Sequence, residues 1–451
     1  MKYPFKHIIL LLIGLFSLQI VAQGRFILNS NSTSRINFEF VSNLMIIPIE
    51  INDVKLSFVL DTGVSKPILF NLSNKDSLGL KNAKTFYLHG LGGDGQIEAL
   101  KSGNNKFRVG EAINPNQDLY VVFDKSIDFT PRLGVLVHGI IGYDIFRDFV
   151  VEVNYNSKYI RLHKPSTFTK KASKKWEVLP MEIYNKKPFI DAKVDIDNEL
   201  KDIKLLIDTG SSDALWLFEN PARGLMPSDS LYFQDYLGKG LSGSVYGKRS
   251  KIKTFNLSSF SLPQVNVAYP DSTSIKIAKT YKDRNGSLGG DILKRFNLFF
   301  DYQNEQLHLK RNSNFKDPFT YNNSGIVLEH NGTMFVKERI KVPSNGDWGI
   351  QNKNKSVQID LSYNYTMVLK PVYRIVELRE SSNAYKAGLR IGDILITING
   401  KQAYNFKLPV INRTLHGKTG NTVRVKIERD GKPMSFKFKL DNAFKKNEPS
   451  N

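Results

Sequence analysis

Two aspartates carry the chemistry that this sequence suggests. The tripeptide Asp61-Thr62-Gly63 recurs as Asp208-Thr209-Gly210, a displacement of 208 − 61 = 147 residues. If equivalent loops of two related halves meet at a shared axis, the two carboxylates come within hydrogen-bond reach. Two carboxyl groups at that distance cannot both be ionised, because their negative charges repel each other. The pair would therefore share one proton and hold an acid beside a base. Such a pair can activate water for attack on an amide carbonyl without a covalent adduct.

The residues that follow each aspartate are suited to holding such a pair. The hydroxyl groups of Thr62 and Thr209 can bond to backbone atoms across the axis and so fix the two loops. Gly63 and Gly210 allow a close backbone approach that a side chain would block. The competing interpretation is a pair of ordinary β-turns with solvated carboxylates. The repeat argues against it, because unrelated turns need not keep one register.

The second copy differs from the first in the residue after the glycine. Ser211 occupies that position in the second copy, whereas Val64 occupies it in the first. We hypothesise that the Ser211 hydroxyl donates a hydrogen bond that favours the ionised form of Asp208. The shared proton would then reside mainly on Asp61, and replacing Ser211 with alanine would shift the acid limb of a pH–rate profile upward.

Both aspartates follow apolar runs that have the alternation of strands. These runs are residues 54–60 and 203–207, and both become fully apolar next to the aspartate, which indicates buried strands. A second landmark keeps the same displacement, because Ile140-Ile141-Gly142 corresponds to Ser287-Leu288-Gly289 (289 − 142 = 147). The sequence therefore predicts two lobes of one fold within one chain.

We expect a mainly β protein with two related lobes and one further domain. The strands are short and punctuated by Gly, Asn and Asp, which indicates small antiparallel barrels with one helical turn after Gly142 and after Gly289. Residues 164–175 are rich in Ser, Thr and Lys and form the expected connection between lobes. The expected parts are an N-terminal lobe (23–165), a C-terminal lobe (166–315), a third domain (316–442) and a polar tail (443–451).

The two aspartate segments also resemble a known family. FVLDTGVSKPILF and LLIDTGSSDALWLF, with GIIGYD and GSLGGD, resemble the aspartic peptidases of the pepsin and retropepsin clan, over residues 40–311. The resemblance implies two β-barrel lobes around a pseudo-twofold cleft, with Asp61 and Asp208 as the catalytic dyad and the GIIGYD and GSLGGD segments as braces. The chain departs from the clan at Ser287, where an apolar residue is usual, and at Val64, where Ser, Thr or Ala is common.

Each lobe carries a glycine-rich hairpin between its two landmarks. These are residues 86–96 in lobe one and 237–246 in lobe two. The clan resemblance implies that the first is a flap over the substrate, formed by Tyr87, Leu88, Gly90, Gly92 and Gly93. A second glycine hairpin suggests one flap per lobe, as in retropepsin dimers, with a plain exposed hairpin as the alternative. Glycines lower the cost of opening such a lid.

The sequence lacks the residues or motifs that other common catalytic and cofactor chemistries require. With no cysteine, the chain can form no disulfide, thiol nucleophile or cysteine–zinc site. It contains no serine nucleophile elbow, phosphate loop or paired-histidine metal motif. Residues 90–95 match a dinucleotide-binding glycine pattern, but the stretch after them is too short and glycine-broken for the helix that this motif requires. We therefore expect no cofactor and no metal.

The C-terminal third resembles another family. Residues 376–403, VELRESSNAYKAGLRIGDILITINGKQA, resemble a PDZ domain of the bacterial type, and residues 333–370 are an unusual insertion. The resemblance implies that the domain binds extended peptides or C-termini by strand addition and recruits substrates. The alternative is a domain that only packs and spaces. The expected peptide-binding residues are Ser324, Gly325, Ile326 and Val327.

The first 22 residues have the composition of a secretory signal peptide. Lys2 and Lys6 precede an apolar run that ends at Ala22. A retained membrane anchor is the alternative, but about fifteen apolar residues fall short of the roughly 20 that span a bilayer. We therefore expect an exported protein of a Gram-negative type of cell, located in the periplasm or outside the cell.

Composition limits the expected partners. A formal charge of +21 favours weak attraction to anionic cell surfaces. Nucleic acid is not expected, because the positive residues are scattered among strands and export keeps the chain away from it. The expected function is an aspartic endopeptidase acting on proteins or peptides as a monomer whose lobes form a pseudo-dimer. The alternatives are a non-catalytic exported peptide-binding protein and a basic cell-surface adhesion module.

Overall fold

The structure is a computed structural model that describes residues 24–29, 32–72, 78–92, 95–124, 127–169, 175–228, 231–281, 283–341 and 363–444. The expected signal peptide and residues 445–451 of the expected tail lie outside these ranges. Within them, no helix is both long and apolar enough to span a membrane. The chain divides into two compact units, one formed by Met1–Asp128 with Val137–Phe319 and the other by Phe129–Leu136 with Thr320–Asn451.

Lobe one of the first unit is an eight-stranded sheet with Asp61 at the end of an inner strand. That strand, β4, pairs antiparallel with β3 and parallel with β9, so its end is held on both sides. Its inward residues Leu56, Phe58 and Leu60 are buried, as the apolar alternation predicts. In sheet order the strands are β2 (Glu39–Val41), β3 (Leu44–Ile51), β4 (Val54–Leu60), β9 (Gly139–Ile141), β5 (Ile68–Leu69), β8 (Ala112–Val122), β7 (Ile97–Val109) and β6 (Lys84–Leu88).

Lobe two repeats this arrangement strand for strand. β15 ends at Ile207, directly before Asp208, and pairs antiparallel with one neighbour, β14, and parallel with the other, β20. The predicted internal repeat is therefore a structural repeat. In sheet order the strands are β13 (Glu182–Tyr184), β14 (Lys187–Ile196), β15 (Glu199–Ile207), β20 (Arg284–Leu288), β16 (Leu215–Leu217), β19 (Phe260–Pro270), β18 (Gly243–Leu257) and β17 (Phe233–Gly240).

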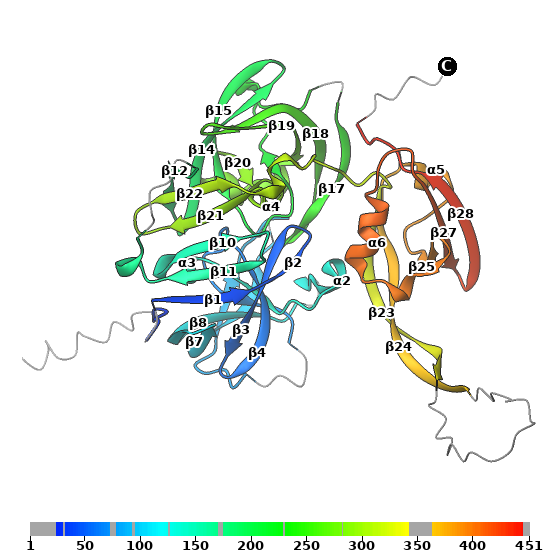
Figure 1. The fold of residues 1–451 in the computed structure, drawn as a ribbon, viewed down its shortest axis with the longest axis horizontal. Helices are drawn as coiled ribbons and strands as arrows, with labels where there is room; N and C mark the ends of the chain where they lie inside the picture. The colour runs from blue at the N-terminus through cyan, green and yellow to red at the C-terminus, as the bar shows by residue number, and fades with distance from the viewer. Residues whose placement is uncertain are drawn as a thin grey trace, which may run out of the picture. The chain divides into compact units, whose positions relative to one another are not determined.

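A six-stranded sheet joins the two lobes (Figure 1). Its central pair, β10 and β21, is antiparallel, and Glu152 lies opposite Phe299. These two residues are themselves 147 positions apart (299 − 152), so the pseudo-twofold axis passes between them. In sheet order the strands are β1 (Thr33–Asn37), β11 (Tyr159–His163), β10 (Val150–Asn154), β21 (Phe296–Asp301), β22 (Gln306–Arg311) and β12 (Glu177–Pro180).

The helical turns expected after Gly142 and Gly289 are present. They are α3 (Tyr143–Asp148) and α4 (Gly290–Leu293). Phe146 of α3 packs against Phe300 of β21 with ring centroids 5.2 Å apart, so one hydrophobic core runs through both lobes. The predicted mainly β architecture of two related lobes is confirmed, and the shared core fixes the lobes to each other.

The second unit has its own sheet and its own core. The strands follow the order β23 (Ile326–Lys341), β24 (Tyr363–Leu378), β25 (Ile394–Ile398), β27 (Thr422–Arg429) and β28 (Lys432–Lys439), with β26 (Lys401–Gln402) paired to β25. Leu408, Ile411 and Leu415 bury one face of helix α6 in this core. The other helices of the unit are α5 (Asn383–Lys386) and α2 (Thr130–Leu133), the latter from the segment between β8 and β9.

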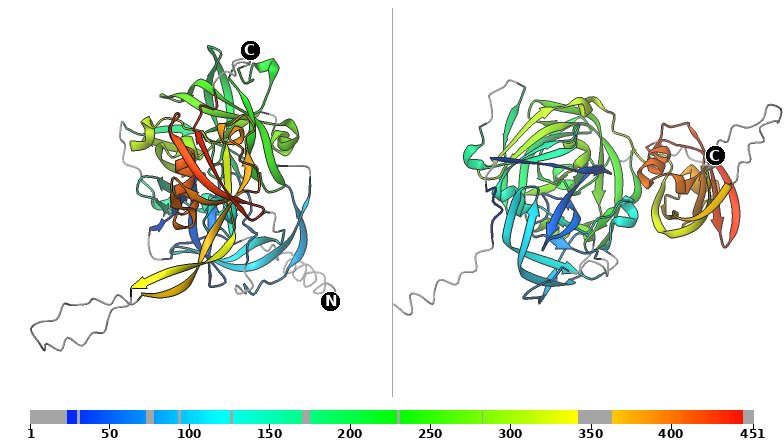
Figure 2. Two further views of the ribbon diagram at one scale, coloured as in Figure 1. Left: turned by 90° about the vertical axis from the view of Figure 1, so that its right-hand side faces the viewer. Right: turned by 60° about the horizontal axis from the view of Figure 1, so that its bottom comes forward.

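The expected insertion at 333–370 is a continuation of two strands. Thr333 pairs with Pro371 and Lys341 pairs with Tyr363, so the described part of the insertion lengthens β23 and β24 into one hairpin. This hairpin extends away from the rest of the second unit (Figure 2). Residues 342–362, which complete the insertion, lie outside the described residues.

Candidate active site

Two backbone hydrogen bonds hold the aspartates at the ends of their strands. The amide of Asp61 donates to the carbonyl of Ile141 at 2.8 Å, and the amide of Asp208 donates to the carbonyl of Leu288 at 2.9 Å. Both acceptors belong to the segments that the clan resemblance implies as braces. The parallel pairing of β4 with β9 and of β15 with β20 therefore sets where each loop begins.

The two threonines connect the loops to each other. The Thr62 hydroxyl donates to the carbonyl of Ile207 at 2.6 Å and accepts from the amide of Thr209 at 3.0 Å. In return, the Thr209 hydroxyl donates to the carbonyl of Leu60 at 2.8 Å and accepts from the amide of Thr62 at 3.0 Å. Both threonines are buried, so this reciprocal set of four bonds is shielded from water. It is the cross-axis bonding that the sequence predicts.

The two glycines bring the carboxyl groups together. A methyl group on Gly210 would lie 2.3 Å from Oδ2 of Asp61, and one on Gly63 would lie 3.3 Å from Oδ1 of Asp208. Gly210 therefore faces the aspartate of the other lobe, and Gly63 lies close to both aspartates. Their amides also donate to the aspartate of their own lobe, from Gly63 to Asp61 at 2.7 Å and from Gly210 to Asp208 at 3.1 Å.

The site makes the two carboxyl groups unequal. Burial raises the pKa of Asp61 to about 7, and the neighbouring charge of Asp208 adds to this rise. Burial also raises the pKa of Asp208, but the positive charges of Arg284 and Lys187 oppose the rise. A hydrogen bond between the two carboxyls raises the pKa of Asp61 and lowers that of Asp208. Asp61 is therefore the carboxyl that keeps a proton below about pH 7.

Sequence reasoning missed the two cations that face this pair. Burial lowers the pKa of Lys187, the first residue of β14, and the charge of Arg284 lowers it further. Burial likewise lowers the pKa of Arg284 to about 10, and the charge of Asp208 opposes this. The repeat held a signal for Arg284, because the equivalent residue of lobe one is the apolar Val137 (284 − 137 = 147).

The structure corrects the hypothesis on Ser211. Its amide donates to the backbone carbonyl of Asp208 at 3.3 Å, and its hydroxyl lies beside Gly289, 3.1 Å from where a methyl group on that residue would be. Within the described residues, the Ser211 hydroxyl donates no hydrogen bond to the Asp208 carboxyl. The predicted preference for ionised Asp208 therefore has a different source, the guanidinium of Arg284.

The tips of the two glycine hairpins contact each other. The hydroxyl of Ser242 accepts from the amide of Gly90 at 3.0 Å and donates to the carbonyl of Gly95 at 3.3 Å. The amide of Ser242 donates to the carbonyl of Leu91 at 2.9 Å. Space is tight, since a methyl group on Gly240 would lie 2.2 Å from the Leu91 oxygen. The second hairpin is therefore a partner of the first rather than a separate exposed loop.

The other residues expected in the first flap have different settings. Leu88 is buried at the end of β6, whereas the Tyr87 side chain is 53% exposed. Gly92 has a φ of 106°, which is accessible to glycine, and a methyl group on it would lie 2.1 Å from the carbonyl oxygen of Gly243. Gly93 lies outside the described residues.

In the second unit, the loop expected to bind peptide is bonded within itself. The side-chain oxygen of Asn322 accepts from the amides of Ser324 at 3.2 Å and Gly325 at 3.1 Å. The Ser324 hydroxyl accepts from the amide of Ile326 at 3.1 Å. Val327 pairs with β24 and is half-buried. The amides that would receive a terminal carboxylate thus already have acceptors.

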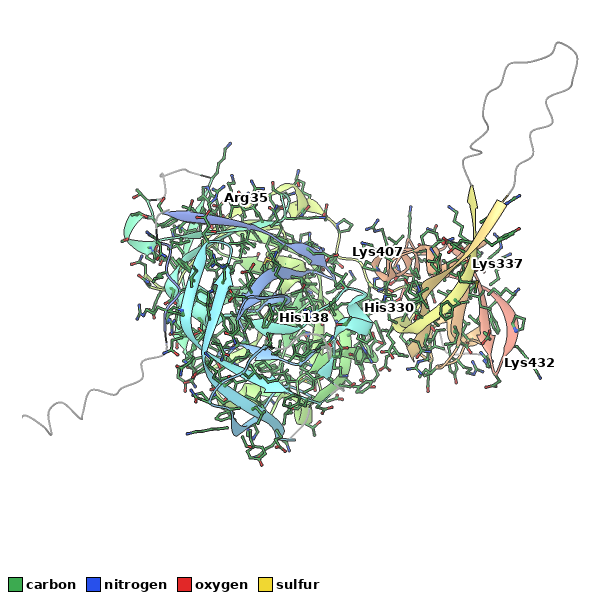
Figure 3. The ribbon with its side chains drawn as sticks, turned by 90° about the horizontal axis from the view of Figure 1, so that it is seen from below. Arg35, His138, His330, Lys337, Lys407 and Lys432 are labelled. Atoms are coloured by element: carbon green, nitrogen blue, oxygen red, sulfur yellow. The ribbon has the colours of Figure 1, made fainter. Side chains whose placement is uncertain are left out.

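Residues 129–136 lie against the strand and helix that border this loop. A methyl group on Gly134 would lie 2.6 Å from Cβ of Leu408 in α6 and 3.4 Å from Nε2 of His330 in β23. Arg132 of α2 forms an ion pair with Glu377 of β24 at 3.4 Å. His330 and Lys407, the residue before α6, are both labelled in Figure 3. The β23–α6 face is therefore partly covered by a segment of the chain itself.

Among the residues that the structure places, the remaining polar groups do not form a metal site. Within the residues that the structure describes, no group of three or more His, Asp or Glu side chains is arranged to hold an ion. What the first unit does contain is a pair of Asp-Thr-Gly loops with buried threonines, which form reciprocal bonds between two equivalent lobes. This combination of fold and site defines the aspartyl-protease class.

Comparison with known families agrees with this assignment. Residues 47–145, within lobe one, match the family described as aspartyl protease, and residues 346–440 match the PDZ domain family. Both resemblances predicted from the sequence are thereby confirmed, and the chain carries an aspartyl-protease domain and a PDZ domain. A comparison with curated protein sequences gave no match.

Proposed function

We propose that the first unit is an aspartic endopeptidase that hydrolyses peptide bonds with a water molecule held between Asp61 and Asp208. The observation that carries this proposal is the pair of half-buried carboxyl groups, of which one has its pKa raised to about 7. Such a pair presents a base and an acid to the same substrate at one pH. The base accepts a proton from water while the acid gives its proton to the carbonyl oxygen. The tetrahedral intermediate then expels the amine, which receives the proton held by the base, while a hydroxyl of the intermediate returns a proton to the acid.

The two hairpin tips are proposed to act as a lid over the substrate. Their mutual bonds through Ser242 would hold the lid closed, and an extended peptide would have to break them to enter. The glycines at the tips keep the cost of that opening low. The substrate class that fits such a lid is an extended polypeptide segment. This agrees with the protein or peptide substrates expected from the sequence.

The PDZ domain is proposed to bind extended peptides and to deliver them to the enzyme. β23 forms one edge of its sheet, which suits strand addition. The internal bonds of Asn322 and Ser324 favour strand addition over capture of a terminal carboxylate. A peptide that bound between His330 and Leu408 would have to displace residues 129–136. Binding at the PDZ domain would then alter a segment that follows β8 of lobe one.

Export is part of the same proposal. The composition of residues 1–22 supports removal of a signal peptide, and the absence of cysteine suits a protein whose stability rests on packing alone. We propose that the enzyme works in the periplasm or outside the cell, as a monomer whose two lobes supply one aspartate each.

The decisive experiment is proteolysis of a random peptide mixture, with and without pepstatin. The protein is compared with Asp61→Asn and Asp208→Asn, variants that keep the size of the side chain and remove its charge. Acid–base catalysis contributes about 10²–10⁴-fold, so each variant should lose at least two orders of magnitude in kcat/KM. Equal residual cleavage in all three proteins would assign the activity to a contaminant. Peptide binding without cleavage would favour the alternative, a non-catalytic peptide-binding protein.

A further inference from the structure

The two lobes differ in the residues behind their aspartates. Lobe one has the apolar pair Val137 and Ile140, both buried. At the equivalent positions, 147 residues later, lobe two has Arg284 and Ser287, which are also buried. An aliphatic pair has thus been exchanged for a cation and a hydroxyl inside an otherwise equivalent strand arrangement.

Arg284 is held in place within its own strand. Its Nε donates to the carbonyl of Gly286 at 3.0 Å, and its Nη2 donates to the Ser287 hydroxyl at 2.6 Å. The guanidinium also lies 5.2 Å from the ring centroid of Phe218. Ser287, which is unusual for the clan, therefore has a specific partner. A buried guanidinium is costly without a compensating negative charge.

The pairing of β15 with β20 shows which aspartate supplies that charge. Ser287 lies beside Leu206 in parallel register, and Asp208 follows Leu206 by two residues, directly after the end of β15. The positive charge bound to Ser287 is therefore on the Asp208 side of the pair. In agreement, Arg284 lowers the pKa of Asp208 and is not among the groups that shift Asp61. Lys187 acts on both carboxyls, so it does not distinguish them.

We propose that Arg284, anchored by Ser287, is a positioning residue that keeps Asp208 ionised and places the shared proton on Asp61. This deepens the proposed function, on which its catalytic consequence rests. Asp208 is then the group that accepts the proton of the attacking water, and Asp61 gives its proton to the carbonyl oxygen of the substrate. The strand arrangement is nearly symmetric, but the charge distribution assigns each lobe one role.

The test replaces the pair of lobe two with the pair of lobe one. The double variant Arg284→Val/Ser287→Ile copies a packing that this fold already contains, and Arg284→Lys keeps the charge as a matched control. Loss of the cation should move the acid limb of the kcat/KM profile upward by about one pH unit, because ionising Asp208 becomes harder. Arg284→Lys should keep the limb near its original position. A folded, active double variant with an unmoved limb would overturn the proposal.

A second measurement separates this inference from the proposed function. Carbon-13 NMR of labelled aspartate carboxyls follows both titrations without any substrate. If the protein cleaves nothing, but Asp208 still titrates below Asp61 and rises in the double variant, the proton assignment stands and the peptidase proposal fails. If Asp208 titrates identically with and without Arg284, the assignment fails whatever the activity. Thermal unfolding of each variant checks that the fold is kept.

A different observation concerns the far end of the β23–β24 hairpin. Phe335 pairs with Leu369, Lys337 with Met367 and Arg339 with Tyr365. Paired residues at alternate positions share one face of an antiparallel ribbon, so these six side chains form a single surface, here called the ribbon face. Its apolar members are unusually exposed: Phe335 by 67%, Met367 by 59%, Tyr365 by 58% and Leu369 by 56%.

The ribbon face combines apolar and cationic side chains and contains no acid. Lys337 and Arg339 are exposed between the apolar residues, and the Lys337 ammonium lies 4.1 Å from the ring centroid of Tyr365. The acidic residue Glu338 lies on the opposite face of the hairpin, where its carboxylate forms an ion pair with Lys370 at 2.7 Å. Apolar side chains with long cations among them suit the boundary between lipid headgroups and acyl chains.

The size of the ribbon face also favours a membrane over a protein partner. Strands lie about 4.8 Å apart and rise about 3.4 Å per residue, so the face covers on the order of 200 Å². A stable protein interface buries about 800 Å² on each partner. A lipid surface makes no such demand, because a few apolar side chains can insert while the cations bind anionic headgroups.

We propose that the ribbon face docks the protein on an anionic lipid surface. The test is co-sedimentation of the purified protein with phosphatidylcholine vesicles, with and without about one quarter phosphatidylglycerol. The protein should bind the anionic vesicles and not the neutral ones. Phe335→Ser/Met367→Ser should abolish binding, and Lys337→Gln/Arg339→Gln should weaken it by roughly fivefold per cation. Met334→Ser is the matched control, because Met334 pairs with Lys370 on the opposite face.

Three outcomes would overturn this second proposal. The protein could fail to bind anionic vesicles, or the ribbon-face variants could bind as well as the control, which would assign binding to the general charge of the chain. Sedimentation velocity supplies the third outcome. A dimer that dissociates in Phe335→Ser/Met367→Ser would assign the ribbon face to a second copy of the chain.

Discussion

Lobe one and lobe two have the same strand order but different interiors near the dyad. Even local bonds are equivalent, since the amide of Ser57 donates to His138 at 3.0 Å and the amide of Lys204, 147 residues later, donates to Asn285 at 2.8 Å. Next to His138 lies the apolar Val137, and next to Asn285 lies Arg284. The repeated backbone thus keeps its symmetry while the buried cation of lobe two makes the two carboxyl groups unequal.

The largest expected effect comes from the two glycines, which should not be equivalent. A methyl group on Gly210 would lie 2.3 Å from the Asp61 carboxyl, whereas on Gly63 its nearest contact is 3.1 Å. Gly210→Ala should therefore displace Asp61 and lower kcat by on the order of 10²-fold, and Gly63→Ala should lower it much less. Steady-state kinetics on one peptide substrate measures both. Equal losses of kcat in the two variants would mean that the difference in methyl contacts does not affect catalysis.

The next effect is the pH dependence of stability. The folded-state pKa of Asp61, raised by burial to about 7, lies above the ordinary value of about 4, so folding favours the protonated form. Its contribution to stability is complete below about pH 4 and is lost as the pH rises toward 7. Denaturant unfolding at several pH values should show a loss of a few kcal/mol over this window. Asp61→Asn should remove that dependence, and a retained slope would place the proton elsewhere.

A smaller effect is expected at the contact between the two hairpin tips. Ser242→Ala removes the bonds from its hydroxyl to Gly90 and Gly95. Each such bond stabilises by about 1 kcal/mol, so the closed lid should be weakened and KM should change by roughly two- to tenfold. Ser244→Ala, two residues away in the same hairpin, is the control. A KM that is the same in both variants would show that the tips do not limit substrate entry.

The smallest effect is expected in a segment that belongs to different units in the two lobes. Residues 129–136 belong to the second unit, whereas their counterparts in lobe two, 276–283, remain in the first. Arg132→Ala removes a partly buried ion pair with Glu377 at 3.4 Å, which is worth about 1 kcal/mol or less. Hydrogen exchange within residues 129–136 should accelerate a few-fold. Unchanged protection there would mean that packing near Gly134 alone holds the segment.

The sequence predicted the repeat, the strands that lead to the aspartates and the threonine bonds. It could do so because two copies in one register constrain each other, as Gly142 and Gly289 show. It did not predict Arg284 or Lys187, since neither belongs to a motif and their role depends on which side chains fold beside them. The sequence pattern assigned the difference between the two carboxyl groups to Ser211, because that hydroxyl is close to Asp208 along the chain. The fold instead turns the hydroxyl toward Gly289.

The second unit was predicted less completely for a related reason. The turn residues around Gly388 and Asn399 mark a PDZ domain in any context, so that assignment needed no tertiary information. The self-bonded loop at Asn322 depends on side-chain geometry. The ladder that continues from Thr333 to Lys341 depends on pairing with residues 363–371, which are distant in the sequence. Contacts between distant residues are what a local pattern leaves undetermined.

The sheet that joins the lobes has a consequence for synthesis. β10 must wait for β21, because Asn154 pairs with Asn297, which is made 143 residues later (297 − 154). At about 5–20 residues per second, the ribosome takes roughly seven to thirty seconds to supply the partner. During that time the nascent chain displays an unpaired strand edge, which is a template for aggregation. A ribosome-bound or export chaperone that covers this edge would raise the yield of correctly closed molecules.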